Sequence, residues 1–294
     1  MTAHDAWVRR TPFEVGIPGR EFADRIFGEI GEEAETRERD TTDPGAFILL
    51  GQVGRALREI QGEEDRGGEA FHRFGAFFFH AYHFHRAGEP LLLLETLAAR
   101  YLVEGDPTFE GWAGELPGEA GYLQLPRHLF WSHPGGEDAP AEPLDGIFWT
   151  RSAGETLSLL VVLGVRGDRP GLSVMELPPV PLSDARSWVR ERVREAGRDF
   201  ETDLPGGELD RLYSVRTLGE ALKLAGRALA YVVTVPEALG EEERPPHPTD
   251  VDEDDPAPSF LSFRRIRLVS DAGAEGALGP EEGGAAEHDD GGSG

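Results

Sequence analysis

The chain has 294 residues, a net charge of −26 at pH 7 and no cysteine. The lack of cysteine excludes disulfides, thiolate zinc sites, cysteine-ligated iron–sulfur clusters and cysteine nucleophiles. The negative charge repels phosphate backbones, so we expect no duplex nucleic acid as a partner. No apolar run approaches the about 18 residues of a membrane-spanning helix, and the start has no signal-peptide pattern. These features predict a cytoplasmic acidic protein that does not bind membranes. The near-exclusive use of arginine as the basic residue fits a GC-rich bacterial genome.

Residues 1–105 are predicted to be a helical region. Apolar residues recur at helical spacing over 22–30 and again over 47–60. The most apolar stretch predicts an aromatic helix hairpin, with one helix over Phe71 to Phe84 and a second over Leu91 to Val103, separated by a glycine–proline break. Aromatic rings cover every side of the first of these helices. We therefore expect it to lie inside a domain with neighbours all round.

Residues 106–239 are predicted to form an antiparallel sheet with two helices packed against it. Turn residues separate the apolar segments, which favours a meander of three or four strands. One strand, Leu157 to Val165, lacks alternation and should be covered on both faces. Helical spacing after the sheet predicts the two helices. The expected strands are Tyr122–Trp131, Gly146–Arg151, Thr156–Arg166 and Leu172–Leu177, and the expected helices are 183–198 and Leu218–Val233.

The C-terminal part is predicted to be mostly solvated. Residues 240–258 combine prolines with an acidic run and read as a linker. Residues 259–270 are too apolar to remain free in water, so we expect them to dock as an edge strand on their own sheet rather than on a partner. Residues 271–294 are of low complexity and predict a disordered acidic tail. The predicted fold class is therefore α+β, a helical N-terminal region followed by a small antiparallel sheet.

Two histidines offer a candidate metal site. His80 and His83 are separated by three residues on the predicted aromatic helix, so both imidazoles could reach one ion. Glu95 on the second helix of the hairpin is a candidate third ligand or general base. Zinc would suit this set and would make the chain a zinc-dependent hydrolase. The alternative is that the histidines are hydrogen-bonded members of an aromatic core.

Aromatic pairs on neighbouring strands offer a different kind of site. Alternation along a strand sends Trp131 and Trp149 to the opposite face from the phenylalanine before each of them. With Arg151 nearby, outward-facing rings could bind a peptide or a planar ligand. The alternative is that helices cover both faces of the sheet and hide the rings.

The docking segment supplies the remaining candidate contacts with a partner. Its apolar residues lie among three arginines, Arg264, Arg265 and Arg267. No catalytic motif in the sequence is specific, so the leading hypothesis is an interaction or accessory protein, with another protein as its partner and no catalysis of its own. The zinc-dependent hydrolase and a small-ligand-binding protein are the competing hypotheses. The residues of the segment assigned to the interaction are Phe260, Phe263, Arg264 and Arg265.

Overall fold

The computed structural model describes ten stretches of the chain and confirms the α+β fold class. These stretches are residues 8–37, 53–56, 58–60, 68–104, 116–132, 141–152, 156–163, 173–177, 206–245 and 259–269. Their helices are α1 (Pro12–Gly16), α2 (Arg20–Arg37), α4 (Gly68–Arg86), α5 (Thr96–Glu104), α7 (Gly206–Thr234) and the 3₁₀ turn η4 (Pro236–Ala238). Their strands are β1 (Leu91–Leu94), β2 (Ala120–Gln124), β3 (Trp131–Ser132), β4 (Glu142–Ser152), β5 (Thr156–Leu163), β6 (Ser173–Leu177), β7 (Leu239–Glu243) and β8 (Phe263–Ile266).

The strands form one mixed sheet in the order β6-β5-β4-β2-β1-β8-β7, with β3 paired to β4. The run β2-β4-β5-β6 is the antiparallel meander that the turn residues predict. The sheet as a whole is not antiparallel, because β1 runs parallel to both β2 and β8. Helix α5 makes the crossover between β1 and β2, as a parallel pair requires.

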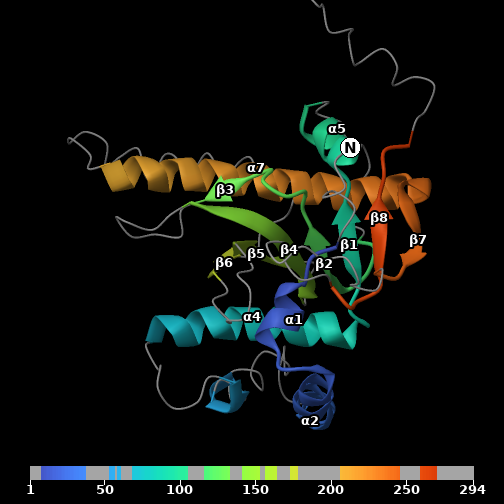
Figure 1. The fold of residues 1–294 in the computed structure, drawn as a ribbon. Coiled ribbons are helices and arrows are strands. Elements are labelled where there is room, and N and C mark those ends of the chain that lie inside the picture. Colours follow the sequence, from blue (N-terminus) through green and yellow to red (C-terminus); the bar gives the residue numbers. More distant parts are fainter. Residues whose placement is uncertain are drawn as a thin grey trace, which may run out of the picture.

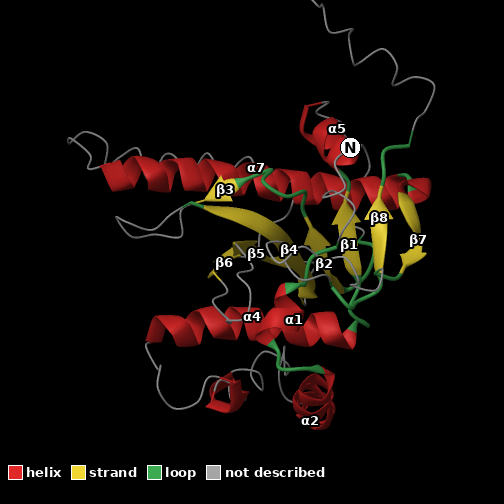
Figure 2. Ribbon diagram, in the orientation of Figure 1, coloured by secondary structure: helices red, strands yellow, loops and turns green. Residues whose placement is uncertain are grey.

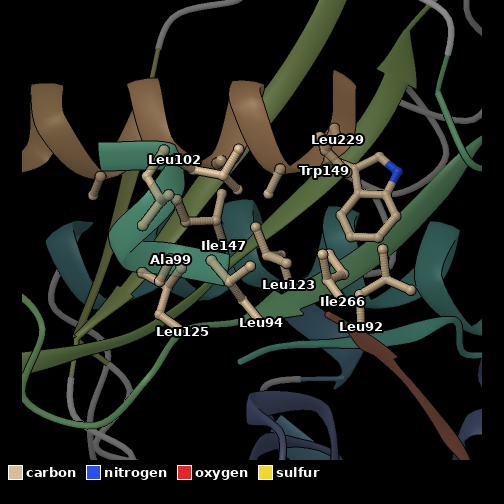
Figure 3. Close-up of a cluster of buried hydrophobic side chains, with 14 of the residues drawn as sticks. Leu92, Leu94, Ala99, Leu102, Leu123, Leu125, Ile147, Trp149, Leu229 and Ile266 are labelled. Carbon is tan, nitrogen blue, oxygen red and sulfur yellow. The ribbon is translucent and has the colours of Figure 1, made fainter. Parts of the chain in front are cut away.

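Helices cover both faces of the sheet (Figures 1 and 2). Helices α5 and α7 lie on one side, where they enclose a mainly aliphatic cluster that includes Trp149 (Figure 3). Helix α4 lies on the other side, and α1 and α2 pack against it in a second, aromatic cluster. Strand β5 contributes alternate side chains to both clusters, which confirms that it is covered on both faces. No helix in the described stretches is long and apolar enough to cross a membrane.

Helix α4 is the aromatic helix that the sequence predicts. It packs between the sheet and α2, so its rings have neighbours on opposite sides. Gly88 ends it with a φ of 84°, and the next residue, Glu89, also has a positive φ, of 61°. The amide of Glu89 donates to the carbonyl of Phe84 at 2.9 Å, which closes the last turn.

The prediction of a second helix from Leu91 is wrong over its first residues. Residues Leu91–Leu94 form strand β1, and helix α5 begins only at Thr96. Leucine is a good helix former, but a short run that is apolar on every side also suits a strand buried on both faces. Leu92 and Leu94 face α5 and α7, whereas Leu91 and Leu93 face α4. The tertiary environment therefore overrides the local propensity.

The C-terminal docking segment lies on its own sheet, as expected, but not at the edge. Strand β8 lies between β1 and β7, and β7 is the outer strand of the order. Strand β7 begins at Leu239, so it includes residues 240–243 of the range predicted to be a linker. Residues 246–258, the tail 271–294 and the helix expected over 183–198 lie outside the described residues.

The other predicted helices agree with the structure where it describes them. Helix α2 includes the apolar stripe of residues 22–30, and α7 includes the stripe of 218–233 but begins earlier. Of the helix expected over 47–60, residues 53–56 and 58–60 are described and are helical. Arg55 of this stretch pairs with Glu29 of α2 at 2.8 Å.

Candidate interaction surface

Phe260 is the most exposed of the large apolar side chains that the structure describes, with 68% of its surface in contact with solvent. It belongs to the anchor segment, residues 259–261, which precedes β8. The backbone of this segment is fixed although the ring is exposed to solvent. The amide of Ser259 donates to the carbonyl of Val8 at 2.9 Å, and Ser259 itself is buried.

Glu14 of α1 holds the anchor segment with both carboxylate oxygens. Oε1 accepts the amide of Phe260 at 2.6 Å, and Oε2 accepts the hydroxyl of Ser259 at 2.8 Å. Glu14 is available for this because it is the third residue of a short helix capped by Thr11. The hydroxyl of Thr11 accepts the amide of Glu14, and Oε2 of Glu14 accepts the amide of Thr11 at 2.7 Å. The capping box thus joins the N-terminal helix to residues about 245 positions later.

Arg10 lies beside the exposed ring. Its guanidinium carbon is 5.2 Å from the centre of the Phe260 ring, a distance typical of a cation–π contact. The Nε of Arg10 is buried and has no hydrogen-bond acceptor among the described residues. The guanidinium of Arg10 is therefore held against an aromatic ring.

The residue before it, Arg9, explains why Arg10 stays in place. The backbone of Arg9 exchanges two hydrogen bonds with the Gln124 side chain, each of 3.1 Å. Its Nε donates to Asp145 at 2.8 Å, and a terminal nitrogen donates to the carbonyl of Leu125. This ion pair is almost buried, with side-chain exposures of 12% and 6%. The chain at Arg9 is therefore fixed to β2 and β4, and Arg10 follows directly.

Tyr122 completes the support under Arg9. Its hydroxyl donates to Asp145 Oδ2 at 2.5 Å. Burial, followed by the neighbouring Asp145 carboxylate, raises the pKa of Tyr122 well above its ordinary value. The phenol therefore stays protonated and remains a donor to Asp145.

The other residues of the docking segment have different environments. Phe263 is buried in the cluster under α4, and the guanidinium of Arg265 lies 5.0 Å from its ring centre. Arg265 also pairs with Glu243 of β7 at 2.9 Å. Arg264 is exposed and donates to the carbonyl of Gly240. Of the four candidate residues in this segment, only Phe260 offers an apolar side chain to a partner.

The two tryptophans do not form a shared patch. Trp149 is buried between the sheet and α7, and its indole N–H has no acceptor among the described residues. Trp131 is exposed on β3, where it stacks on His128 with ring centres 5.2 Å apart. Arg151 is exposed and pairs with Glu119 at 3.2 Å. Helices cover both faces of β4, which is the alternative that the sequence left open.

The candidate metal ligands are not gathered around one point. His80 is buried, and its Nδ1 lies 2.9 Å from Thr150 Oγ1. Burial, followed by the charge of nearby His83, lowers the pKa of His80 to about 3. The ring of His83 contacts Phe79 and Tyr82. Glu95 lies between β1 and α5, and its carboxylate pairs with Arg267 at 3.4 Å. Among the described residues, no group of three or more potential ligands could hold a metal ion.

Sequence reasoning did not identify Arg10 and Glu14 as site residues. The pattern Thr11-Pro12-x-Glu14 does carry a signal, since it is a capping box with proline at the first helical position. That signal predicts a helix start but not the contact with Phe260. Contacts across such a separation depend on the order of strands in the sheet.

Comparisons with known proteins add little. No family model matches the chain, and no curated protein matches its sequence. Among solved structures it is similar to the crystal structure of AcrVA2, with 12% sequence identity and a TM-score of 0.37, over 83% of this chain and 78% of that one. A similarity this low supports no conclusion about function. Function is therefore inferred from the site alone.

Proposed function

We propose that this chain is a cytoplasmic binding protein without catalysis of its own, and that Phe260 and Arg10 anchor a partner protein. The observation that supports the proposal is an exposed aromatic ring on a fixed backbone. The amide of Phe260 is held by Glu14, and its ring is held by Arg10. Interfaces concentrate their binding energy in a few aromatic and arginine side chains, so this pair has the right composition.

Preorganisation makes the pair suitable for binding. A side chain that is ordered only on association loses about 0.5–1.5 kcal/mol of conformational freedom. The contacts of Ser259, Phe260 and Arg10 fix this surface before a partner arrives. Burying a phenylalanine side chain in an apolar pocket contributes about 1.5–3 kcal/mol. Together these terms favour Phe260 as the centre of an interface.

The charge of the chain indicates the kind of partner. A net charge of −26 accelerates association with a positively charged surface and slows it with a negative one. We therefore propose a partner with a basic surface around an apolar pocket, and the pocket takes the ring of Phe260. The absence of cysteine agrees with a reducing compartment such as the cytoplasm.

Site-specific crosslinking tests this proposal. A photoreactive phenylalanine analogue is placed at position 260 of the full chain and, as a matched control, at position 97. Leu97 is 65% exposed, almost the same as Phe260, but lies at the start of α5. We expect a specific crosslinked protein from position 260 and not from position 97.

The identified partner is then purified and its affinity is measured for three forms of the chain. Phe260→Ala should weaken binding at least about tenfold, whereas Leu97→Ala should leave it unchanged. Because the Phe260 ring is exposed, its removal should change the free energy of unfolding by less than about 0.5 kcal/mol. Equal affinities of wild type and Phe260→Ala would contradict the proposal.

A further inference from the structure

An arginine that lies over an aromatic ring can still bind an acid, and Arg25 of α2 does both. Its guanidinium carbon is 5.3 Å from the centre of the Phe22 ring, and a terminal nitrogen is 2.6 Å from Oε2 of Glu59. The ring attracts the positive charge through its π electrons, while N–H groups of the guanidinium donate to the carboxylate. We call this combination the ring–arginine–acid arrangement.

Arg265 of β8 forms the same arrangement in a different setting. Its guanidinium carbon lies 5.0 Å from the centre of the Phe263 ring, and its Nε donates to Oε2 of Glu243 at 2.9 Å. Here the acid lies on the neighbouring strand β7, whereas the acid of Arg25 lies on another helical stretch. In both cases a second element of the chain supplies the acid.

Arg10 has the ring without the acid. Its guanidinium carbon lies 5.2 Å from the centre of the Phe260 ring, but no carboxylate of the described residues pairs with it. Nε is the one nitrogen of this side chain that is buried without an acceptor, and Arg10 as a whole is half-buried, so its terminal nitrogens face solvent. A guanidinium stays charged at physiological pH. The acid that would complete the arrangement must therefore come from elsewhere.

The acids beside this surface are already bound by other groups. Both carboxylate oxygens of Glu14 accept hydrogen bonds, from the anchor segment and from the cap of α1. The carboxylate of Asp145 pairs with Arg9 and accepts the hydroxyl of Tyr122. If either acid turned toward Arg10, its present donors would lose their acceptor. The contacts on the page thus keep the terminal nitrogens of Arg10 open.

From this comparison we infer that Arg10 and Phe260 form a carboxylate-binding site, and that an aspartate or glutamate side chain at the edge of the partner's apolar pocket fills it. The inference rests on the proposed function and names the chemistry of the partner at this site. The ring enters the pocket, and the terminal nitrogens of Arg10 bind the acid. An arginine can bind a carboxylate through two parallel hydrogen bonds, so the acid also fixes the orientation of the ring.

One acid at this point agrees with a partner whose surface is otherwise basic. The charge of −26 belongs to the whole chain and guides the approach of the partner, whereas Arg10 acts at a single point after contact. A pocket that encloses a phenylalanine ring needs walls on several sides. A folded surface provides such walls and a free chain terminus does not, so the acid is a side chain of that surface.

The carboxylate site is tested first without a partner, by nuclear magnetic resonance on the full chain. The probe is 4-methylpentanoate, which joins a carboxylate to a short apolar group, and 4-methylpentanamide is its uncharged control. Sodium chloride keeps the ionic strength constant. We expect the Nε–H signal of Arg10 to shift with the carboxylate and not with the amide. The Nε–H signals of Arg25 and Arg265 should shift much less, because these side chains already bind acids.

Variants then show which side chains bind the probe, with the backbone amide of Phe260 as the reporter. Arg10→Gln should weaken binding at least about tenfold, because it removes a charged hydrogen-bonded pair. Arg25→Gln is the matched control and should bind as wild type does. Equal shifts with the carboxylate and the amide, or an unchanged affinity in Arg10→Gln, would overturn the inference.

The chain's own acidic residues 250–255 are an alternative source of the carboxylate. Their acids are replaced by the corresponding amides in the full chain, and the titration with 4-methylpentanoate is repeated. We expect the affinity to stay the same. A large gain in affinity would show that these acids occupy Arg10 in the free chain, and it would also overturn the inference.

The last part uses the partner identified by crosslinking, whose crosslinked peptide locates the acid. Arg10→Glu should weaken binding at least about tenfold, and a change of the partner's acid to lysine should restore it. Binding of the probe at Arg10 with no Phe260-dependent partner would retain the carboxylate site and reject the proposed function. Loss of partner binding in Phe260→Ala, with no effect of Arg10→Gln, would retain the function and reject the carboxylate.

Discussion

His80 gives the sharpest prediction for the stability of the protein. It lies on α4 facing β4, with only 1% of its surface exposed. Its ring is 6.1 Å from the ring of Phe148, and its Nδ1 contacts the Thr150 hydroxyl. Because burial and nearby His83 lower its pKa to about 3, folded His80 is neutral throughout the physiological range.

The sign of the effect follows from proton counting. An unfolded chain binds the His80 proton near pH 6.5, and the folded chain binds it only near pH 3. Between these values the unfolded state holds more protons, so the free energy of unfolding decreases as the pH falls. Each pH unit in this range lowers it by about 1.4 kcal/mol, and the whole interval by up to about 5 kcal/mol. That is a large part of the about 5–15 kcal/mol that stabilises a typical domain.

The assay is urea unfolding followed by circular dichroism at pH 7.5, 6.5, 5.5 and 4.5. Wild type is compared with His80→Asn, which keeps a polar group near Thr150 but cannot titrate. We expect His80→Asn to be less stable at pH 7.5 by about 1–3 kcal/mol, since its packing and hydrogen bond are poorer. Its stability should then decrease less steeply with acid than that of wild type.

The difference between the two slopes isolates His80, because all carboxylates that titrate in acid are common to both proteins. His128→Asn, which removes an exposed histidine, should behave like wild type at each pH. Parallel stability curves for wild type and His80→Asn would refute the reasoning, since they would mean that His80 takes up no extra proton on unfolding.

Two further predictions concern packing and charge in the core. A Cβ at Gly121 would overlap the Trp149 ring, so Gly121→Ala should lower the free energy of unfolding by about 1–3 kcal/mol. In Gly118→Ala the new Cβ would lie 3.8 Å from the carbonyl oxygen of Ala120, an ordinary contact, so the free energy of unfolding should change little. Urea unfolding midpoints of the two variants test this difference. Asp145→Ala leaves the charge of Arg9 almost buried without its partner and should be destabilising by about 3–5 kcal/mol. Glu119→Ala removes only the exposed pair with Arg151, so a comparable loss there would contradict this explanation.

Much of the fold is predictable from local patterns. The aromatic helix, the meander and the long helix α7 each carry enough periodic or turn signal to be identified. Leu91–Leu94 is ambiguous, since an apolar run of four residues suits a buried strand or a helix equally. Whether this run forms a strand or a helix depends on whether strands from elsewhere in the chain pair with it on both sides, as β2 and β8 do.

The candidate site was predictable only in part. The apolar composition of residues 259–270 predicts that this segment docks, and Phe260 is one of the interaction residues predicted in it. Which ring stays outside is decided by the register of β8, because Phe263 pairs with Leu91 and turns into the core while Phe260 precedes the strand. The roles of Arg10 and Glu14 arise from a contact between distant parts of the chain, and a single sequence carries no record of it.

The position of β8 has a consequence for how the protein is made. Strand β8 is the last described strand in the chain, yet it lies between β1 and β7. During synthesis, β1 and β7 cannot pair with β8 until Ile266 has left the ribosomal exit tunnel. Until then two unpaired edges are open to other nascent chains, the condition under which strands aggregate. A message truncated before this strand should therefore yield a product that cells degrade rather than a shortened, working protein.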